Sequence, residues 1–413
     1  MHGALIFQAS ENRERFLWYR AGRPTGSRDD CGVSLKCRLL ICADWFDPGF
    51  RAGGPIRSCV NLVELLGESA EIAMITSDRD LGENRPYTEI QSDRWIIWRE
   101  LARVCYCRSS SQRMFQFVRS LKVWKPDAIY LNSMFSVPGT LWPLLWVRLS
   151  RNSVRIVLAP RGMLKPSALA QKGWKKRPLL KFVRWLGLVK KVWFHATSAE
   201  ELEEIQAVFG SVNAELVSNV PCVPLLEVRP HERAPGLLRL CFVGRVHPIK
   251  NLLWLLNAMA SLDCRCQLIV VGPVEDQAYY EQCRKAVSRL PECVSVEFVG
   301  AKKEVEVREL LLNAEAMILP TQGENFGHAI FESLAVGTPV IISDRTIWRD
   351  LYEQQAGWDL SLDPAEFRKA ILDLSKMSVQ DYQQLRQGAL RLAQGFLGAN
   401  NFRTDYLRLF AFA

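Results

Sequence analysis

Two glutamates, Glu324 and Glu332, stand with seven residues between them at an expected junction of a loop and a helix. The apolar run 316–319 just before them predicts a buried parallel strand, and Gly327 is expected to open the helix. The loop therefore lies at the carboxyl end of a strand, where open α/β sheets bind ligands. Free N–H groups at a helix start attract an anion, and carboxylates accept paired hydrogen bonds from sugar hydroxyls. A diphosphate sugar would satisfy both requirements.

The whole string is more specific than two glutamates at a fixed spacing, which also occur in buried helices with a polar entry loop. From Gly323 to Val340 it closely resembles the signature of retaining glycosyltransferases of the group-1 or family-4 class, which have the GT-B fold. The resemblance implies that Glu324 contacts the donor sugar and Glu332 the nucleotide ribose. It also assigns three further residues to the donor loop: Asn325, Phe326 and Gly327.

A second charged motif follows the strand-like run 238–243, where Gly244 lets the backbone turn before Arg245 and Lys250. Alone, two such cations would indicate only a solvated surface. In the resembled family, the corresponding residues hold the donor diphosphate. Cleavage of the sugar–phosphate bond leaves negative charge there, which fixed cations stabilise without a metal. The resemblance thus implies that Glu324, Arg245 and Lys250 are catalytic and that no side chain forms a covalent intermediate.

Two motifs are expected on the opposite side of the cleft. Gly53 and Gly54 follow the first strand and resemble the family's N-terminal Gly-Gly loop, which lets the backbone approach the donor phosphates or the acceptor. Asp78-Arg79-Asp80 matches the D-x-D metal-binding signature of the other glycosyltransferase fold. Here it follows the second strand, and the Arg79 charge competes with a metal ion. We therefore expect a loop or acceptor-side role for Asp78, with no bound metal and no cofactor besides the nucleotide sugar.

Three more residues are candidates for the acceptor side. Arg161 lies in a Pro-Arg-Gly-Met segment that resembles a polysaccharide-synthesising subset of the family. It should either point into the cleft or be a helix-capping or inter-domain arginine. Asn132 stands where many relatives carry a histidine, which puts a histidine contact to the donor sugar in doubt. His195 either faces the cleft or is a satisfied core residue. After it, Ser198 and Glu201 predict a capping box at a helix start.

From Arg38 onward, short apolar runs alternate with helical patterns, which predicts parallel sheets with helices on both faces. The strand-like runs are 39–43, 72–76, 96–98, 128–131, 154–159, 192–196, 214–217, 238–243, 268–271, 294–298, 316–319 and 340–342. Together with the resemblance, this alternation predicts an α/β protein of the GT-B type. Two Rossmann-like domains would then face one another across a ligand cleft.

The expected divisions of the chain follow from these runs and from composition. They are a poorly ordered extension 1–36, an acceptor-binding domain 37–221, a proline-containing linker 222–236, a nucleotide-sugar-binding domain 237–395, and a helix over 396–413 that packs back on the first domain. The extension lacks the continuous apolar region of a signal peptide. Residues 128–147 carry no charge, but Asn132, Pro138 and Pro143 interrupt them, so a membrane span is not expected.

The 413 residues carry a formal charge of +9, and the charge is unevenly placed. Residues 101–200 hold 19 Lys and Arg against 2 Asp and Glu, an excess of +17, so the rest of the chain is net −8. Basic and bulky apolar residues alternate over 174–191, which is typical both of a helix at an anionic membrane surface and of a solvated domain helix. No nucleic-acid recognition motif is present. The 12 cysteines include no C-x2-C pair, which favours reduced thiols over a zinc site or a disulfide framework.

These observations and the resemblance predict a cytoplasmic, retaining glycosyltransferase bound peripherally to the inner face of the membrane. Expected partners are a nucleotide sugar donor, a lipid-linked or cell-surface glycan acceptor and the anionic membrane, with no nucleic acid. Two other functions are compatible with the motifs: a non-catalytic scaffold of a polysaccharide assembly complex, and a nucleotide-sugar epimerase on the same fold. A dinucleotide oxidoreductase is disfavoured because no strand is followed by G-x-G-x-x-G.

Overall fold

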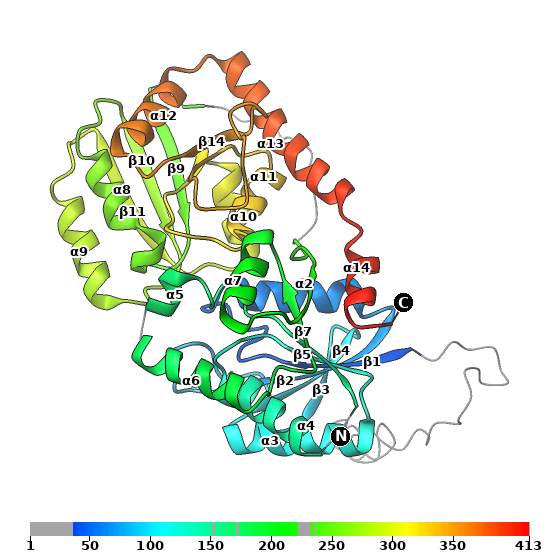
Figure 1. Cartoon of the computed structure of the whole chain (residues 1–413). Coiled ribbons are helices and arrows are strands. Elements are labelled where there is room, and N and C mark those ends of the chain that lie inside the picture. Colours follow the sequence, from blue (N-terminus) through cyan, green and yellow to red (C-terminus); the bar gives the residue numbers. More distant parts are fainter. Residues whose placement is uncertain (1–35, 151–152, 171–172, 222–232, 235, 413) are drawn as a thin grey trace, which may run out of the picture.

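The computed structural model describes residues 36–412 except 151–152, 171–172, 222–232 and 235. Within them the chain forms two α/β domains, each built on its own sheet (Figure 1). The expected fold class of two Rossmann-like domains is confirmed. The extension expected over 1–36 and most of the linker expected over 222–236 lie outside the described residues. Among the described helices, none is both long and apolar enough to cross a membrane.

The first domain contains an eight-stranded sheet in the order β3-β4-β2-β1-β5-β6-β7-β8. Neighbouring strands are parallel except for the antiparallel pair β3 and β4. The strands are β1 (Cys37–Cys42), β2 (Ala70–Ser77), β3 (Trp95–Trp98), β4 (Ala102–Cys107), β5 (Ala128–Leu131), β6 (Arg155–Leu158), β7 (Val192–Ala196) and β8 (Asn213–Leu216). The helices are α2 (Gly54–Leu66), α3 (Ser110–Arg119), η1 (Ser120–Trp124), η2 (Val137–Leu141), α4 (Trp142–Ser150), α5 (Pro166–Ala170), α6 (Gly173–Trp185) and α7 (Ala199–Phe209).

Strand β1 shows why both faces of this sheet are covered. Leu40 and Cys42 belong to the hydrophobic cluster on one face, whereas Leu39 and Ile41 belong to the cluster on the other. Successive side chains of a strand point to opposite faces, so a strand buried on both sides reads as one continuous apolar run. That continuity is the signal by which β1 could be predicted.

The second domain contains a six-stranded sheet in the order β11-β10-β9-β12-β13-β14, in which all pairs are parallel. Its strands are β9 (Leu238–Val243), β10 (Cys266–Val271), β11 (Val294–Gly300), β12 (Ala316–Leu319), β13 (Val340–Ser343) and β14 (Gly357–Leu360). Its helices are η3 (Pro248–Lys250), α8 (Leu252–Met259), α9 (Gln277–Val287), α10 (Glu304–Leu312), α11 (His328–Ala335), α12 (Pro364–Lys376) and α13 (Val379–Ala399).

The end of the chain returns to the first domain. Helix α13 ends at Ala399, and a separate helix, α14 (Phe402–Leu409), packs against α2 (Figure 1). The Asn401 side chain caps α14 by accepting a hydrogen bond from Thr404 N at 3.3 Å. Tyr406 and Leu409 are buried in the core of the first domain. The region expected as one helix over 396–413 therefore contains the end of one helix and a second helix.

Both sheets contain a point where the direction of winding reverses. In the first sheet β1 lies between β2 and β5, and in the second β9 lies between β10 and β12. In open α/β sheets, ligands bind in the crevice outside the carboxyl ends of the strands at such a point. The loops after β1 and β5, and those after β9 and β12, are therefore the places to look for a site.

Candidate functional site

The loop after β9 turns tightly enough to return on itself. A Cβ on Gly272 would lie 2.0 Å from the Gly244 carbonyl oxygen, so the backbone of β10 can pass this loop only with a glycine there. Beyond Gly244, the His247 side chain caps η3, and Asn251 takes a left-handed conformation before α8. These turns bring the stem of Lys250 back over Gly244.

Lys250 forms an ion pair with Glu324, which joins the loop after β9 to the loop after β12. Both side chains are only 15% exposed. Burial, and after it the nearby Arg245 charge, lowers the pKa of Lys250 to about 7. Arg245 itself pairs with Glu275 at a more exposed edge of the site. A buried lysine with a lowered pKa is stabilised in its charged form when an anionic ligand arrives.

The loop that carries Glu324 is held in place by backbone hydrogen bonds. Gln322 N donates to the Ile249 carbonyl oxygen at 2.8 Å, which ties this loop to η3. Glu324 N donates to the Arg345 carbonyl oxygen at 3.0 Å. The Glu324 carboxylate is thus positioned by main-chain contacts on both sides.

Phe326 anchors the same loop through its buried side chain. Its side chain is buried, and its ring packs in a cluster with His328, Phe331, Trp348 and Phe396. Gly327, with a φ of 75°, then takes the left-handed conformation through which the chain enters α11. Of the residues expected in the donor loop, Phe326 therefore turns its side chain away from the cleft.

Asn325 lies at a close contact between the two domains. A Cβ on Gly162 of the first domain would be 2.3 Å from Asn325 Oδ1, so a larger residue at 162 would displace Asn325. Within the part of the chain that the structure describes, Asn325 Nδ2 is buried and has no hydrogen-bond partner. A buried donor left unpaired costs free energy that a ligand oxygen would recover. The amide is therefore available to a ligand beside Glu324.

Glu332 lies in the middle of α11 and is reached from the first domain by Arg57 of α2. The Arg57 guanidinium is 3.4 Å from the Glu332 carboxylate and 2.7 Å from that of Glu304. Burial raises the pKa of Glu332, and the Arg57 charge opposes that rise. Sequence reasoning did not identify Arg57, although its place one helical turn after Gly54 was a usable signal.

Two hydrogen bonds also cross between the domains. Ser58 Oγ lies 3.0 Å from His328 Nε2, and Lys165 Nζ donates to the Glu324 carbonyl oxygen at 2.9 Å. Burial lowers the pKa of His328 to about 3, so its ring is neutral. Neither Lys165 nor His328 was a sequence candidate. Lys165 follows Arg161 by four residues, and only that local segment pointed toward it.

The glycine pair after β1 begins α2. Gly53 has a φ of 64° and occupies the N-cap position, where no side chain caps the helix. A Cβ on Gly54 would be 3.7 Å from the ring of His328, so the backbone here lies beside the start of α11. The structure thus brings Gly54 to the same junction as Glu324 and Glu332.

Arg161 and Asn132 contact one another rather than extending freely into the cleft. Arg161 Nε donates to Asn132 Oδ1 at 2.7 Å, and its Nη2 donates to Tyr130 Oη at 2.7 Å. Its Nη1 donates to Asn219 Oδ1. Arg161 therefore joins the ends of β5 and β6 to the segment after β8.

His195 lies in the core. It has no exposed surface, and both ring nitrogens are paired, with Tyr130 Oη and the Val217 carbonyl oxygen at 2.8 Å each. Burial, with the Arg161 charge, lowers its pKa to about 3. Of the two positions expected for His195, the structure has the core one, and the ring does not reach the cleft. Its assignment to the acceptor side is corrected accordingly.

Asp78 and Asp80 are buried and hold their own loop. Asp78 pairs with Arg79 and accepts a hydrogen bond from Ser92 Oγ at 2.8 Å. Asp80 accepts from Phe50 N at 2.8 Å, which fixes the loop before Gly53. The Asp78 carboxylate is therefore occupied by protein donors, so of the two expected roles the structure has the loop one and not the acceptor-side one. Among the described residues, no group of three or more His, Cys, Asp and Glu could hold a metal ion.

Glu201 departs from the expected capping box. Ser198 Oγ caps α7 by accepting from Glu201 N at 3.2 Å, as predicted. The buried Glu201 carboxylate instead accepts from Thr197 N at 2.8 Å and from Gly162 N at 2.6 Å. It therefore anchors the turn that presents Gly162 to the second domain.

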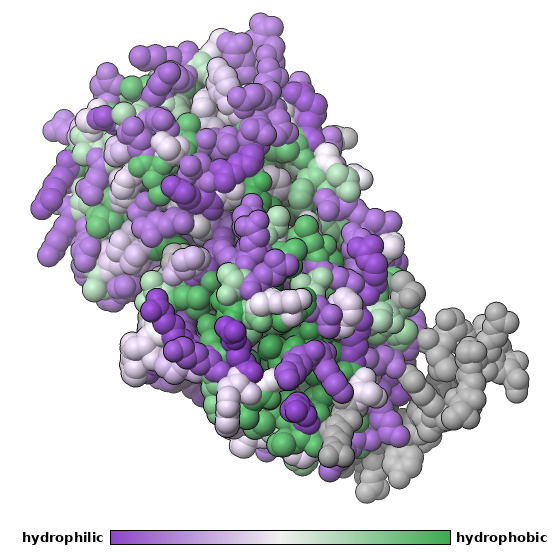
Figure 2. Space-filling view, in the orientation of Figure 1, coloured by the Kyte–Doolittle hydropathy of each residue, from purple (hydrophilic) through white to green (hydrophobic). Residues whose placement is uncertain are grey.

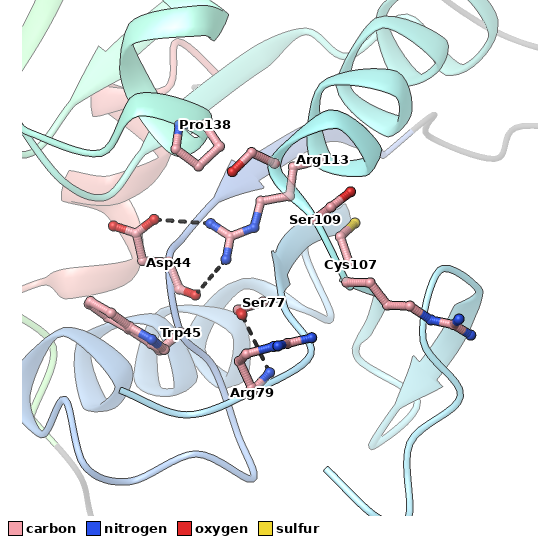
Figure 3. Close-up of a pocket in the computed structure, with 10 residues that line it drawn as sticks. Asp44, Trp45, Ser77, Arg79, Cys107, Ser109, Arg113 and Pro138 are labelled. Carbon is pink, nitrogen blue, oxygen red and sulfur yellow. Dashed lines mark hydrogen bonds and ion pairs between the residues drawn. The ribbon is translucent and has the colours of Figure 1, made fainter. Parts of the chain in front are cut away.

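A pocket of about 320 Å³ opens at the carboxyl ends of β1, β2 and β4 (Figure 3). Arg113 of α3 reaches into it, and its guanidinium donates to Asp44 Oδ1 at 3.1 Å and to the Asp44 carbonyl oxygen at 3.3 Å. Ser136 Oγ donates to the same Oδ1 at 2.5 Å. The lining residues are Asp44, Trp45, Ser77, Arg79, Cys107, Arg108, Ser109, Ser110, Arg113 and Pro138.

Two Rossmann-like domains whose facing loops meet at their switch points define the GT-B fold. Solved structures share it over nearly the whole chain. Sucrose-phosphate synthase from Thermosynechococcus elongatus matches with a TM-score of 0.70 at 17% identity, covering 92% of this chain and 100% of that chain. HepE of Anabaena, solved in complex with UDP-glucose, matches with a TM-score of 0.65 at 15% identity, covering 90% and 99%.

The family model described as glycosyl transferases group 1 matches residues 238–377, which carry the Lys250–Glu324 pair. The D-inositol 3-phosphate glycosyltransferase of Streptomyces bingchenggensis is 31% identical over 169 residues, 36% of this chain and 37% of that protein. The phosphatidyl-myo-inositol mannosyltransferase of Mycobacterium tuberculosis is 28% identical over 152 residues, 35% and 39%. The chain thus spans from about a third to about half of the length of the curated relatives it matches. The family match covers the second domain, and the solved structures show that the whole chain has the GT-B fold.

Proposed function

We propose that the protein transfers a sugar from a nucleotide diphosphate sugar to an acceptor, with retention of configuration at the transferred sugar. The observation that carries this proposal is the buried Lys250–Glu324 pair beside the unpaired Asn325 amide, at the switch point of the second sheet. A cation, a carboxylate and an amide together match the diphosphate and hydroxyl groups of such a donor. The neighbour solved with UDP-glucose has the same fold, which supports the choice of ligand class.

The proposed reaction is a front-face substitution. The bond from the sugar C1 to the diphosphate oxygen breaks, the acceptor oxygen bonds to C1 on the same face, and the acceptor proton passes to the leaving diphosphate. Lys250 and Arg245 stabilise the charge that builds on that diphosphate. Glu324 and Asn325 orient the sugar hydroxyls, and Glu332 orients those of the ribose. The two cations make a metal ion unnecessary in this scheme.

The proposed acceptor is a lipid-linked or cell-surface glycan at the inner face of the cytoplasmic membrane. Support comes from one face of the first domain, where large apolar side chains are exposed beside lysines. Figure 2 shows hydrophobic and hydrophilic residues interspersed on the part of the molecule where Figure 1 has α3, α4 and α6. The exposed apolar residues include Phe115, Val123, Val137, Trp142, Leu145, Leu149, Trp174, Phe182 and Trp185.

Helix α6 contributes the most exposed members of this apolar face. Trp174 and Trp185 are 76% and 79% exposed, whereas Leu180 and Leu188 of the same basic and apolar segment, 174–191, are buried in the core. Lys176 and Arg184 donate to carbonyl oxygens of the protein, so the other exposed cations of this segment are Lys175, Arg177, Lys181, Lys190 and Lys191. Exposed tryptophan beside lysine suits an anionic interface.

The test is a panel of UDP-, GDP- and dTDP-sugars added to the purified protein, with the melting temperature as readout. Binding to the native state raises stability by mass action, so one nucleotide series should raise the melting temperature in proportion to its concentration. The Glu324→Gln variant should lose the preference among sugars that share a nucleotide. No shift with any donor would contradict the proposal. Conversion of the donor sugar in the absence of acceptor would favour an epimerase instead.

A further inference from the structure

We propose that the pocket at the carboxyl ends of β1, β2 and β4 binds a phosphate group carried by the acceptor. The inference rests on the proposed function, because it assigns a chemical class to the acceptor of that reaction. It depends on the residues of the pocket rather than on any residue of the donor loops.

The pocket presents more positive than negative charge. Arg79, Arg108 and Arg113 line it, and Asp44 is the one carboxylate among its lining residues. The partners of Arg79 and Arg108 are Asp78 and Asp93, neither of which lines the pocket. The pair with the buried Asp78 holds the Arg79 guanidinium in place, whereas Arg108 lies at the exposed edge of the pocket. Because a guanidinium has five N–H donors, these pairings leave donors for an anionic ligand among the described contacts.

Helix α3 adds to the positive electrostatic potential of the pocket. It begins at Ser110, which lines the pocket, and its N-cap Ser109 accepts a hydrogen bond from Gln112 N at 3.2 Å. The first amide groups of a helix have no partner within it, and the helix dipole favours an anion at this end. A phosphate between the arginines and this helix start would receive charge-assisted hydrogen bonds from both.

The position of the pocket links it to the donor site. Asp44 and Trp45 stand at the start of the loop after β1, and the same loop ends at Gly53 and Gly54 beside α11. Trp45 is half-buried and faces the pocket next to Asp44 (Figure 3). Its ring offers an apolar surface for a sugar ring, while the arginines hold the phosphate attached to it. A phosphorylated sugar held here would lie on the first-domain side of the donor.

The experiment uses the full chain with the donor site filled by a saturating amount of the nucleoside diphosphate that binds best in the donor panel. Glucose 1-phosphate and glucose are then titrated in by calorimetry. Arg108→Glu is the main variant, because Arg108 is 68% exposed and we expect its replacement to leave the fold intact. Arg113→Gln is the second variant. Arg94→Gln, an exposed arginine that does not line the pocket, is the matched control.

We expect glucose 1-phosphate to bind more tightly than glucose, and Arg108→Glu and Arg113→Gln to weaken its binding by tenfold or more. Arg94→Gln should bind as the unmodified chain does. Vesicles of phosphatidylcholine with and without phosphatidic acid separate the sources of the phosphate. Loss of phosphatidic-acid-dependent binding in Arg108→Glu would indicate a lipid phosphate, and unchanged vesicle binding a soluble one.

The proposal is overturned if neither phosphate-bearing probe binds, or if the pocket variants bind both probes as the Arg94→Gln control does. Nucleoside diphosphate affinity is measured for every variant. If nucleoside diphosphate still binds but glucose 1-phosphate and phosphatidic acid do not, only the phosphate pocket is contradicted. If no nucleoside diphosphate binds the unmodified chain, the proposed function itself is lost.

Discussion

Lys165 Nζ, in the first domain, donates a hydrogen bond of 2.9 Å to the carbonyl oxygen of Glu324, in the second. The carboxylate of the same glutamate pairs with Lys250. The Lys165 charge also contributes to the lowered pKa of Lys250, so the two ammonium groups are close enough to interact. Cations from both domains therefore converge on one residue of the donor loop, and contact between the domains brings a further positive charge to it.

Lys165→Met should impair catalysis more than donor binding. The substitution keeps an unbranched side chain and removes the charge that the first domain brings to the donor loop. We expect kcat for transfer to fall by roughly 10²–10³, in the range found when one fixed group that stabilises transition-state charge is removed. Nucleoside diphosphate affinity should change little, because the diphosphate contacts proposed above, Arg245 and Lys250, lie in the second domain. The control is Lys181→Met, at an exposed lysine of the same domain. A rise in KM with kcat unchanged would show that Lys165 serves binding alone.

Donor binding should depend on pH through Lys250. Burial lowers the pKa of this group to about 7, so the free protein loses the charge above that pH, while a bound diphosphate favours the charged form. Affinity should therefore be nearly constant below pH 7 and fall by roughly tenfold per pH unit above it, with uptake of a proton. Calorimetry in buffers of different ionisation enthalpy measures that proton. The Lys250→Arg variant keeps its positive charge at all these pH values, so its affinity should change less with pH. An equal pH dependence in both proteins would show that a group other than Lys250 causes it.

Transfer should survive EDTA. Lys250 and Arg245 can offset the charge of the leaving diphosphate, and the Asp78 and Asp80 carboxylates are occupied by protein donors. Initial rates are measured with and without chelator after extensive dialysis. Loss of activity in EDTA with recovery on addition of Mg²⁺ or Mn²⁺ would show that a metal ion is required.

The apolar face of the first domain should bind anionic vesicles in a salt-dependent way. Each lysine near an anionic surface contributes about 1 kcal/mol, and salt screens that attraction over roughly 10 Å. Trp185→Ala should lower the binding that remains at high salt, whereas Tyr352→Ala, an exposed aromatic of the second domain, should not. Co-sedimentation is the measurement. Equal binding to neutral and anionic vesicles would mean that the lysines face solvent and do not contribute to membrane binding.

The fold class could be predicted because most strands are continuous apolar runs, but two strands were missed. β4 (Ala102–Cys107) contains Arg103, and it pairs with the antiparallel β3. β14 (Gly357–Leu360) is a short edge strand that begins with glycine and contains Asp359. Neither has the uninterrupted run typical of a strand covered on both sides.

The residues of the candidate site were also only partly predictable from the sequence. Lys250 and Glu324 could be assigned to one site because each lies in a recognisable motif after a strand of the same sheet. Arg57, Ser58 and Lys165 were not assigned to it, because their partners lie in the other domain, far away in the chain, and local spacing does not specify such partners. His195 illustrates the opposite error, since a histidine at the end of a strand can be either a ligand contact or a core residue, and only its partners distinguish them.

Nucleoside diphosphate binding to the Arg245→Ala and Lys250→Ala variants tests the central claim most directly. Calorimetry is done with the nucleoside diphosphate of the best donor, and Lys285→Ala, at an exposed lysine of α9, is the control. We expect each site variant to lose roughly 2–4 kcal/mol of binding free energy, as buried charged pairs do, with the melting temperature of the free protein retained. The control should bind as the unmodified chain does. Unchanged affinity in both site variants would contradict the assignment of the diphosphate to Arg245 and Lys250.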